Sequence, residues 1–247
     1  PPRSTPKPSS AASDVYKRQE EDHIDLNKFD KLPKFIAVEG PIGAGKTTLT
    51  KLLANSFNYD TFLEEPSQNP FLPDFYINPS QAALATQLFF LFQRVKQIQE
   101  LRQEDIFTSN RVSDFLLDKD RLFAKATLSA EELKLYEQIY QYLSIDLPTP
   151  DLVIYLQAET KTLYERVMHR GIDMEKTISF EYLELLNETY KEFFFEFDRS
   201  PVLIVNSDYL DFQSNKNDYN LLLEKLLDYF NNQEGTKMYF NPSPTLI

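Results

Sequence analysis

Short apolar runs alternate along this chain with longer stretches of helical periodicity. We expect buried strands at residues 35–38, 60–64, 106–114, 151–157 and 202–205. We expect helices from residue 46 and over residues 80–102, 129–143, 160–170, 179–197 and 217–231. Because strands that alternate with helices form parallel sheets, the pattern predicts an α/β fold with a five-stranded parallel sheet and helices on both faces.

The first predicted strand runs directly into a glycine-rich turn and a helical pattern. This turn fits the spacing G-x-x-x-x-G-K-[ST] of a phosphate-binding loop, and the stretch consists of Gly40, Pro41, Ile42, Gly43, Ala44, Gly45, Lys46, Thr47 and Thr48. Glycines let backbone N–H groups turn toward a phosphate, Lys46 adds positive charge at the β- and γ-phosphates, and Thr47 offers a hydroxyl to Mg²⁺. The stretch therefore predicts a P-loop NTPase fold.

Composition and charge narrow the classes of partner. The chain has 247 residues, 42% of them hydrophobic, which is enough for one sizeable core. Its net charge of −12 argues against a nucleic-acid partner, because such affinity comes largely from Lys and Arg. It has no cysteine and no apolar run of membrane-spanning length, so we expect no disulfide, no membrane partner and a cytoplasmic location.

The chain divides into four segments by composition. Residues 1–19 are rich in Pro and Ser and resemble a translated sequencing adapter, so we expect an artefactual or disordered tail. If so, the true start of the gene is unknown and an upstream domain is left open. We expect an N-terminal extension over residues 20–33, one catalytic domain over 34–231 and a C-terminal tail over 232–247.

A phosphate-binding loop alone leaves several activities open. Residues 215–218 fit the guanine-reading pattern N-K-x-D of GTPases, but they do not follow a strand directly and no Asp-x-x-Gly occurs. A nucleoside-monophosphate kinase of thymidylate-kinase type is another alternative, and so is a nucleotide-dependent binding switch. The acidic pair Glu64 and Glu65 after the second strand favours a neutral hydroxyl acceptor over a phosphorylated one.

Several motifs together resemble the deoxynucleoside kinase family, over about residues 34–231. Those motifs are residues 40–48, Glu65-Pro66, Asn69-Pro70-Phe71, Phe75-Tyr76, Gln87, Arg94, and Arg170-Gly171 through Glu175 to Glu181-Tyr182-Leu183. The resemblance is closest to bacterial members that act on purine deoxynucleosides. It implies ATP-dependent phosphorylation of a deoxynucleoside 5′-hydroxyl with Mg²⁺, and a homodimer.

The resemblance also implies a role for each matching acceptor-site residue. Glu65 matches the carboxylate that takes the 5′-hydroxyl proton, and Tyr76 with Glu175 matches the pair that binds the sugar 3′-hydroxyl. Gln87 and Arg94 match residues that read the base edge. The remaining matches are a ring that stacks on the base, Phe123, and arginines of a lid over the phosphates, Arg166 and Arg170.

Two positions depart from the family pattern. Where the family usually has an acidic-Arg-Ser triplet at the end of the third strand, this chain has Ser113-Asp114-Phe115, with no arginine. We expect Asp114 to supply a carboxylate for Mg²⁺-bound water or for the 5′-hydroxyl, and leave open whether it or Glu65 is the principal base. The lid has Ile172 in place of a third arginine. Lys119 or Arg121 is a candidate to compensate for the missing charge.

Overall fold

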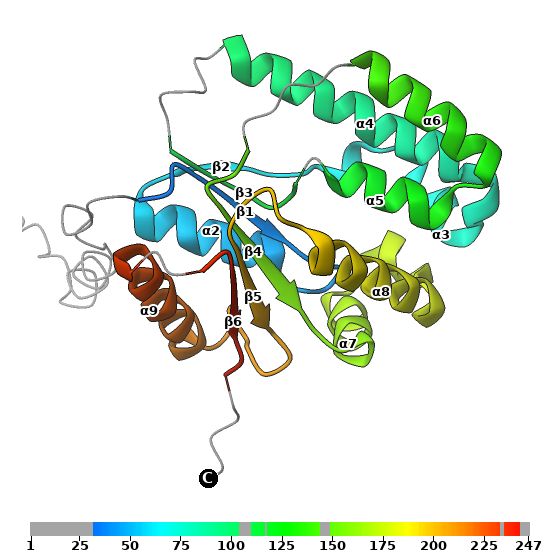
Figure 1. Cartoon of the computed structure of the whole chain (residues 1–247). Helices are drawn as coiled ribbons and strands as arrows, with labels where there is room; N and C mark the ends of the chain where they lie inside the picture. The colour runs from blue at the N-terminus through cyan, green and yellow to red at the C-terminus, as the bar shows by residue number, and fades with distance from the viewer. Residues whose placement is uncertain (1–31, 104–109, 117, 144–148, 233–234, 243–247) are drawn as a thin grey trace, which may run out of the picture.

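The computed structural model describes residues 32–103, 110–116, 118–143, 149–232 and 235–242. Its centre is a six-stranded sheet in the order β2-β3-β1-β4-β5-β6, in which every pair is parallel (Figure 1). The strands are β1 (Phe35–Glu39), β2 (Asp60–Phe62), β3 (Arg111–Ser113), β4 (Leu152–Gln157), β5 (Val202–Asn206) and β6 (Lys237–Phe240).

Helices cover both faces of the sheet, because the central strands are apolar on both sides. The helices are α2 (Lys46–Phe57), α3 (Leu72–Ile77), α4 (Pro79–Gln103), α5 (Asp118–Thr127), α6 (Ala130–Leu143), α7 (Thr160–Arg170), α8 (Phe180–Glu196) and α9 (Lys216–Asn232), with short 3₁₀ turns η2 (Pro66–Gln68) and η3 (Asp173–Thr177). One core packs α2 and α9 against β1, β4 and β5, and a second packs α5 and α8 against the other face. Helices α4 and α6 form an outer layer beyond α5 (Figure 1).

Local signals set the helix ends where the sequence predicts them. Ser129 and Glu132 form a capping box in which the Glu132 N–H donates to Ser129 Oγ over 3.3 Å and the Ser129 N–H donates to Glu132 Oε2 over 3.0 Å. The Ser179 hydroxyl accepts from Tyr182 N over 3.1 Å at the start of α8. Gly171 ends α7 with φ of 68°, a conformation that favours glycine.

The structure corrects the expected elements in three places. Helix α3 lies in a stretch rich in turn formers, where no helix was expected. Residues 237–240, expected in a C-terminal tail, form β6, so the sheet has six strands and not five. Helix α5 lies where no helix was expected. The third strand begins at Arg111, and residues 106–109 of the expected strand lie outside the described residues, as do residues 1–31.

Candidate active site

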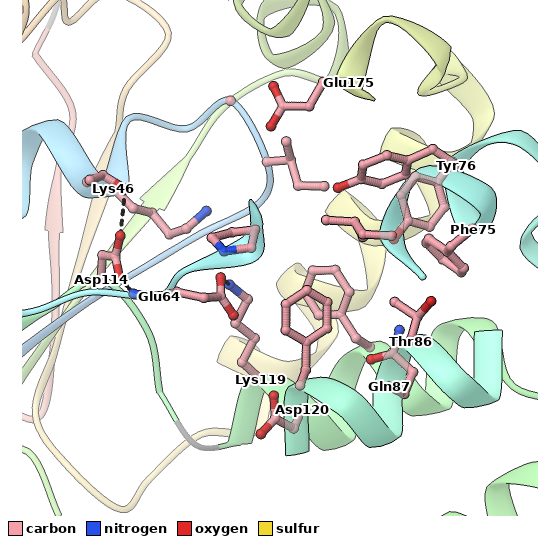
Figure 2. A pocket seen from close by; sticks show the side chains of 18 of the residues that line it. Lys46, Glu64, Phe75, Tyr76, Thr86, Gln87, Asp114, Lys119, Asp120 and Glu175 are labelled. Carbon is pink, nitrogen blue, oxygen red and sulfur yellow. Dashed lines mark hydrogen bonds and ion pairs between the residues drawn. The ribbon is translucent and has the colours of Figure 1, made fainter. Parts of the chain in front are cut away.

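A pocket opens at the carboxyl ends of β1, β2 and β3, where open α/β sheets bind ligands (Figure 2). Strand β1 leads into the phosphate-binding loop, β2 leads to Glu64, and β3 leads to Asp114. The opposite wall comes from α3, α4, α5 and η3. The pocket therefore joins a loop built for phosphates to a cavity with aromatic walls.

Two glycines of the phosphate-binding loop are required by close backbone approaches. A Cβ on Gly40 would lie 2.5 Å from the carbonyl oxygen of Leu156, and one on Gly43 would lie 2.7 Å from that of Leu163. Gly43 also has φ of 86°, which side-chain-bearing residues rarely adopt. The loop can thus turn its N–H groups inward at the start of α2.

Lys46 lies inside the loop with its ammonium bound to the backbone. Its Nζ donates to the carbonyl oxygens of Gly40 over 2.8 Å and Pro41 over 2.9 Å. Burial, helped by the positive charge of Lys119, lowers the pKa of Lys46 to about 8. An incoming phosphate group would stabilise the charged form, so the site is built to receive an anion.

Thr47 and Asp114 meet as expected for a metal-binding pair. Thr47 Oγ1 donates to Asp114 Oδ2 over 2.5 Å, and the backbone N–H of Glu64 donates to Asp114 Oδ1 over 2.8 Å. These are hard oxygen donors, which suit Mg²⁺. The described residues contain no cluster of three metal-binding side chains. That fits Mg²⁺, which usually takes one or two protein ligands together with substrate phosphates.

Glu64 is one of four carboxylates that line the pocket. It accepts from Lys119 Nζ over 2.5 Å (Figure 2) and from Arg94 Nη2 over 2.7 Å, and its side chain is 14% exposed. Burial alone would raise the pKa of Glu64, but the charges and hydrogen bonds of Lys119 and Arg94 outweigh burial and lower the pKa to about 2. Glu64 is therefore ionised at neutral pH.

The structure does not place Glu65, the residue expected as the base, in the pocket. Glu65 is exposed and accepts a hydrogen bond from Gln68 in η2. Successive side chains of an extended segment point to opposite sides, so only one of two adjacent acids can face the cavity. The structure therefore corrects the placement by one residue, to Glu64.

Gln87 lines the pocket, but Arg94 does not. The Gln87 amide donates to Thr127 Oγ1 over a long 3.4 Å. Arg94 is buried behind the wall, where its Nε and Nη2 donate to Asp120 over 2.8 Å and 2.9 Å and Nη2 also reaches Glu64. The two residues share one helix, yet Arg94 is bound to carboxylates instead of facing a base.

Aromatic side chains form the walls around Gln87. The pocket is lined by Phe75, Tyr76, Phe90, Phe123 and Tyr182. Tyr76 and Tyr182 make an edge contact with ring centroids 6.4 Å apart. Such a cavity with a few polar groups is suited to a flat ring. Phe123 therefore lies where the sequence predicts it.

Tyr76 and Glu175 lie at one side of the pocket (Figure 2), which Arg170 also lines. Arg170 Nη2 donates to Glu175 Oε2 over 2.5 Å. Burial and the nearby Glu175 charge raise the pKa of Tyr76, so its hydroxyl stays protonated. This side of the pocket thus combines a hydroxyl donor and a carboxylate acceptor, which can bind one sugar hydroxyl.

Arg166, expected beside Arg170 in the lid, points elsewhere. Its Nη2 donates to the carbonyl oxygens of Ser207 over 2.7 Å and Leu210 over 3.0 Å, so it fixes the loop after β5. Of the two residues considered as replacements for the missing arginine, Lys119 lines the pocket, whereas Arg121 pairs with Glu137 over 3.0 Å.

The sequence reasoning gave no site role to three polar residues that line the pocket, Glu64, Thr86 and Asp120, and it named Lys119 only as a candidate to compensate for the missing arginine. The sequence gives one indication of Glu64, because this residue directly precedes Glu65, the predicted base. Lys119 and Asp120 lie on α5, which was not recognised as a helix. A buried acid at the end of β1, Glu39, was also missed; it accepts from Gly40 N, Leu116 N and the Tyr190 hydroxyl and so holds the loop in place.

The N-K-x-D pattern has a local role. Asn215 Nδ2 donates to Asp218 Oδ1 over 2.8 Å, and Asp218 Oδ2 accepts from Asp211 N over 2.7 Å, so these side chains order the loop before α9. They do not line the pocket. The structure gives no support to a GTPase.

The parallel sheet and its phosphate-binding loop define a P-loop nucleotide-binding fold. A sequence model of the deoxynucleoside kinase family matches residues 36–231, and the chain belongs to that family. The chain is 37% identical to the deoxyguanosine kinase of Bacillus subtilis over 190 residues, which cover 75% of this chain and 92% of that one. It is 34% identical to the deoxyadenosine kinase of Dictyostelium discoideum, over 71% of this chain and 74% of that one.

A solved structure agrees with this placement. The deoxyadenosine kinase from M. mycoides with bound dATP superposes with a TM-score of 0.67 at 29% identity, covering 78% of this chain and 99% of that one.

Among the described residues, no helix has both the length and the apolar character to cross a membrane.

Proposed function

We propose that this enzyme transfers the γ-phosphoryl group of ATP to the 5′-hydroxyl of a deoxynucleoside, with Mg²⁺. The observation that carries the proposal is the position of Glu64 between Lys46 of the phosphate-binding loop and the aromatic cavity around Gln87. Phosphoryl transfer needs positioning, charge neutralisation and a group that accepts the hydroxyl proton. All three requirements have a candidate residue in one pocket.

Glu64, in place of Glu65, is the proposed proton acceptor. Tyr76 and Glu175 are proposed to bind the sugar 3′-hydroxyl, and Arg170 the phosphates. Thr47 and Asp114 would hold Mg²⁺, which neutralises phosphate charge when bound. Asp114 already bonds to Thr47 and to the Glu64 backbone, and this supports a metal-binding role over a role as base.

A neutral acceptor fits the charges of the cavity better than a nucleoside monophosphate does. Apart from Lys46, the cations that line the pocket are already paired with carboxylates, Lys119 with Glu64 and Arg170 with Glu175; behind the wall, Arg94 is paired with Asp120. An acceptor phosphate would have to displace one of these carboxylates. The pairing therefore favours a free deoxynucleoside over the thymidylate-kinase alternative.

The proposed base is a purine, adenine or guanine. Gln87 can donate and accept at the same time, as pairing with the N6/N7 edge of adenine requires. Its present partner, Thr127, is 3.4 Å away, so the amide is available to a base. The names of the relatives, deoxyguanosine and deoxyadenosine kinases, support the same choice. Arg94, bound to Asp120, would act on the base only through that carboxylate.

Four finer parts of the proposal concern the whole enzyme: its oligomeric state, its partners, its location and its place in metabolism. Exposed apolar side chains on α4 and α6, namely Phe92, Leu135 and Tyr142, support a homodimer. The negative net charge supports small-molecule partners over nucleic acid. We place the enzyme in the cytoplasm, in nucleotide salvage; the cysteine-free composition is compatible with a reducing compartment.

An assay of the four deoxynucleosides with ATP and Mg²⁺ tests the function. We expect 5′-monophosphates, with kcat/KM higher for deoxyadenosine or deoxyguanosine than for deoxycytidine and thymidine. ATP hydrolysis without an acceptor would instead support a binding switch, and turnover of deoxynucleoside monophosphates alone would support the alternative kinase. Lys46→Ala is the control: it should abolish turnover while the melting temperature stays close to that of the wild type.

A further inference from the structure

Lys119 lies in the pocket but has no proposed role in binding or catalysis. Its ammonium binds Glu64 and lies 5.6 Å from the centroid of the Phe123 ring, and its side chain is only 10% exposed. It lines the same pocket as Lys46, close enough to lower the pKa of Lys46 (Figure 2). Two lysine ammonium groups thus face the end of the pocket where the phosphates would lie.

One of the two cations that contact Glu64, Arg94, can hold the carboxylate in place without the other. Arg94 is held by two hydrogen bonds to Asp120 and still reaches Glu64 over 2.7 Å, so it is a fixed partner. Among the described residues, Lys119 contacts one carboxylate, at the end of a flexible stem, so its ammonium can move. A carboxylate that two cations hold in its ionised form is also a weak proton acceptor.

We propose that Lys119 leaves Glu64 when ATP binds and donates to the γ-phosphoryl group, so that donor binding itself prepares Glu64 as the base. The 5′-oxygen then bonds to the γ-phosphorus, the bond from that phosphorus to the bridging oxygen of ADP breaks, and the 5′-hydroxyl proton passes to Glu64. Lys119 stabilises the negative charge of the transferred group, and Arg94 keeps Glu64 in place. This inference rests on the proposed kinase function.

A Lys119 side chain that binds the γ-phosphate behaves differently from one that only holds Glu64. A phosphate contact makes Lys119 important for ATP, which has a γ-phosphate, and unimportant for ADP, which has none. A role confined to Glu64 would disappear once the Glu64 charge is removed. Binding of ATP and ADP, measured in a Glu64→Gln background, therefore isolates the phosphate contact.

The experiment measures dissociation constants for ATP and ADP with Mg²⁺ by calorimetry, in Glu64→Gln with and without Lys119→Met. We expect Lys119→Met to weaken ATP binding at least ~10-fold and ADP binding by less than ~2-fold, as for one charge-assisted phosphate contact. In the Glu64-containing enzyme, it should lower kcat ~10²-fold or more and change the deoxynucleoside KM by less than ~3-fold, and Lys119→Arg should recover part of the loss.

Lys125→Met, on the exposed side of α5, is the matched control and should change none of these values. Equal effects on ATP and ADP, or no effect on either, would overturn the inference. If Lys119→Met unfolds, Lys119→Gln goes through the same measurements, because it keeps a hydrogen-bond donor without the charge. Failure of the wild-type enzyme to phosphorylate any deoxynucleoside would contradict the proposed function. The ATP and ADP dissociation constants would still test the phosphate contact of Lys119, because they do not depend on turnover.

Discussion

Glu64 and Glu65 are chemically identical neighbours with opposite environments. Glu64 is bound by Lys119 and Arg94 inside the pocket, whereas Glu65 is in solvent beside Gln68. The sequence predicts an acid at the end of the second strand, and that much is right. Which of two adjacent acids faces inward depends on where the strand ends, and strand ends are poorly defined by sequence.

Substitution of these two acids tests their roles directly. Glu64→Gln keeps the shape of the side chain but removes the proton acceptor, so we expect kcat to fall by roughly 10²- to 10⁴-fold with little change in the deoxynucleoside KM. Glu65→Gln is the matched control and should stay within ~2-fold of the wild type. Steady-state kinetics decide between them, and a larger loss in Glu65→Gln would restore Glu65 as the base.

The low pKa of Glu64 also predicts how stability depends on pH. Its pKa in the folded protein is about 2, against an ordinary value of 4.5. A lowered carboxyl pKa stabilises the fold above the unfolded-state value, by about 3 kcal/mol here, and this stabilisation is lost as pH falls from 4.5 toward 2.

Urea unfolding at pH 6 and pH 3 measures this contribution. Between these pH values the wild type should lose about 2 kcal/mol more of its unfolding free energy than Glu64→Gln does, because glutamine cannot titrate. Other carboxyl groups titrate in both proteins and cancel in the difference. Equal losses in the two proteins would mean that Glu64 is not held by its two cations.

At the scale of elements, the sequence pattern did not predict α3, α5 or β6. Helix α3 has only six residues and lies in a stretch rich in turn formers. Helix α5 follows β3 closely and is rich in charge, so its short apolar face did not stand out. Strand β6 has four residues and lies at the edge of the sheet, where only partial burial gives a weak pattern. The long buried strands and the capped helices were recognised because their signals are local. Of these elements, α5 matters most for the active site, because it carries Lys119 and Asp120.

Strand β6 predicts a stability difference between neighbouring positions. Phe240 packs against the core of α2 and α9, whereas Tyr239 is 70% exposed. Phe240→Ala should cost about 1–2 kcal/mol, which lowers the melting temperature of a protein of this size by roughly 2–8 °C. Tyr239→Ala should change the melting temperature by less than ~2 °C. Scanning calorimetry on both variants checks the expectation; a smaller effect at Phe240 than at Tyr239 would contradict the packing of β6.

At the scale of the whole molecule, the order of motifs identifies the family but not the arrangement of the pocket. The phosphate-binding loop depends on residues adjacent in sequence, so its function is readable there. The pocket depends on contacts between distant elements, such as Arg94 on α4 with Asp120 on α5. Gln87 and Arg94 share a helix, but sequence alone does not indicate that Asp120 would bind Arg94 behind the wall.

The outer layer of the molecule predicts its oligomeric state. Leu135 and Tyr142 lie two turns apart on α6, so they share a face, and their side chains are 47% and 90% exposed. The neighbouring α4 adds Phe92, which is 51% exposed. Single exposed apolar residues are ordinary, but several on one helix pair on the outside of the molecule favour an interface between two copies.

We expect a dimer for the wild type and a monomer for the double variant Leu135→Asp/Tyr142→Asp, because each aspartate would place a charge inside the apolar contact. Analytical ultracentrifugation at micromolar concentration measures this. Phe195→Asp, which changes an 83% exposed aromatic on α8, is the control and should remain dimeric. Neither Leu135 nor Tyr142 lines the pocket, so the monomeric variant should keep its kcat per subunit. A monomeric wild type would contradict the dimer, and dissociation by Phe195→Asp alone would move the interface to α8.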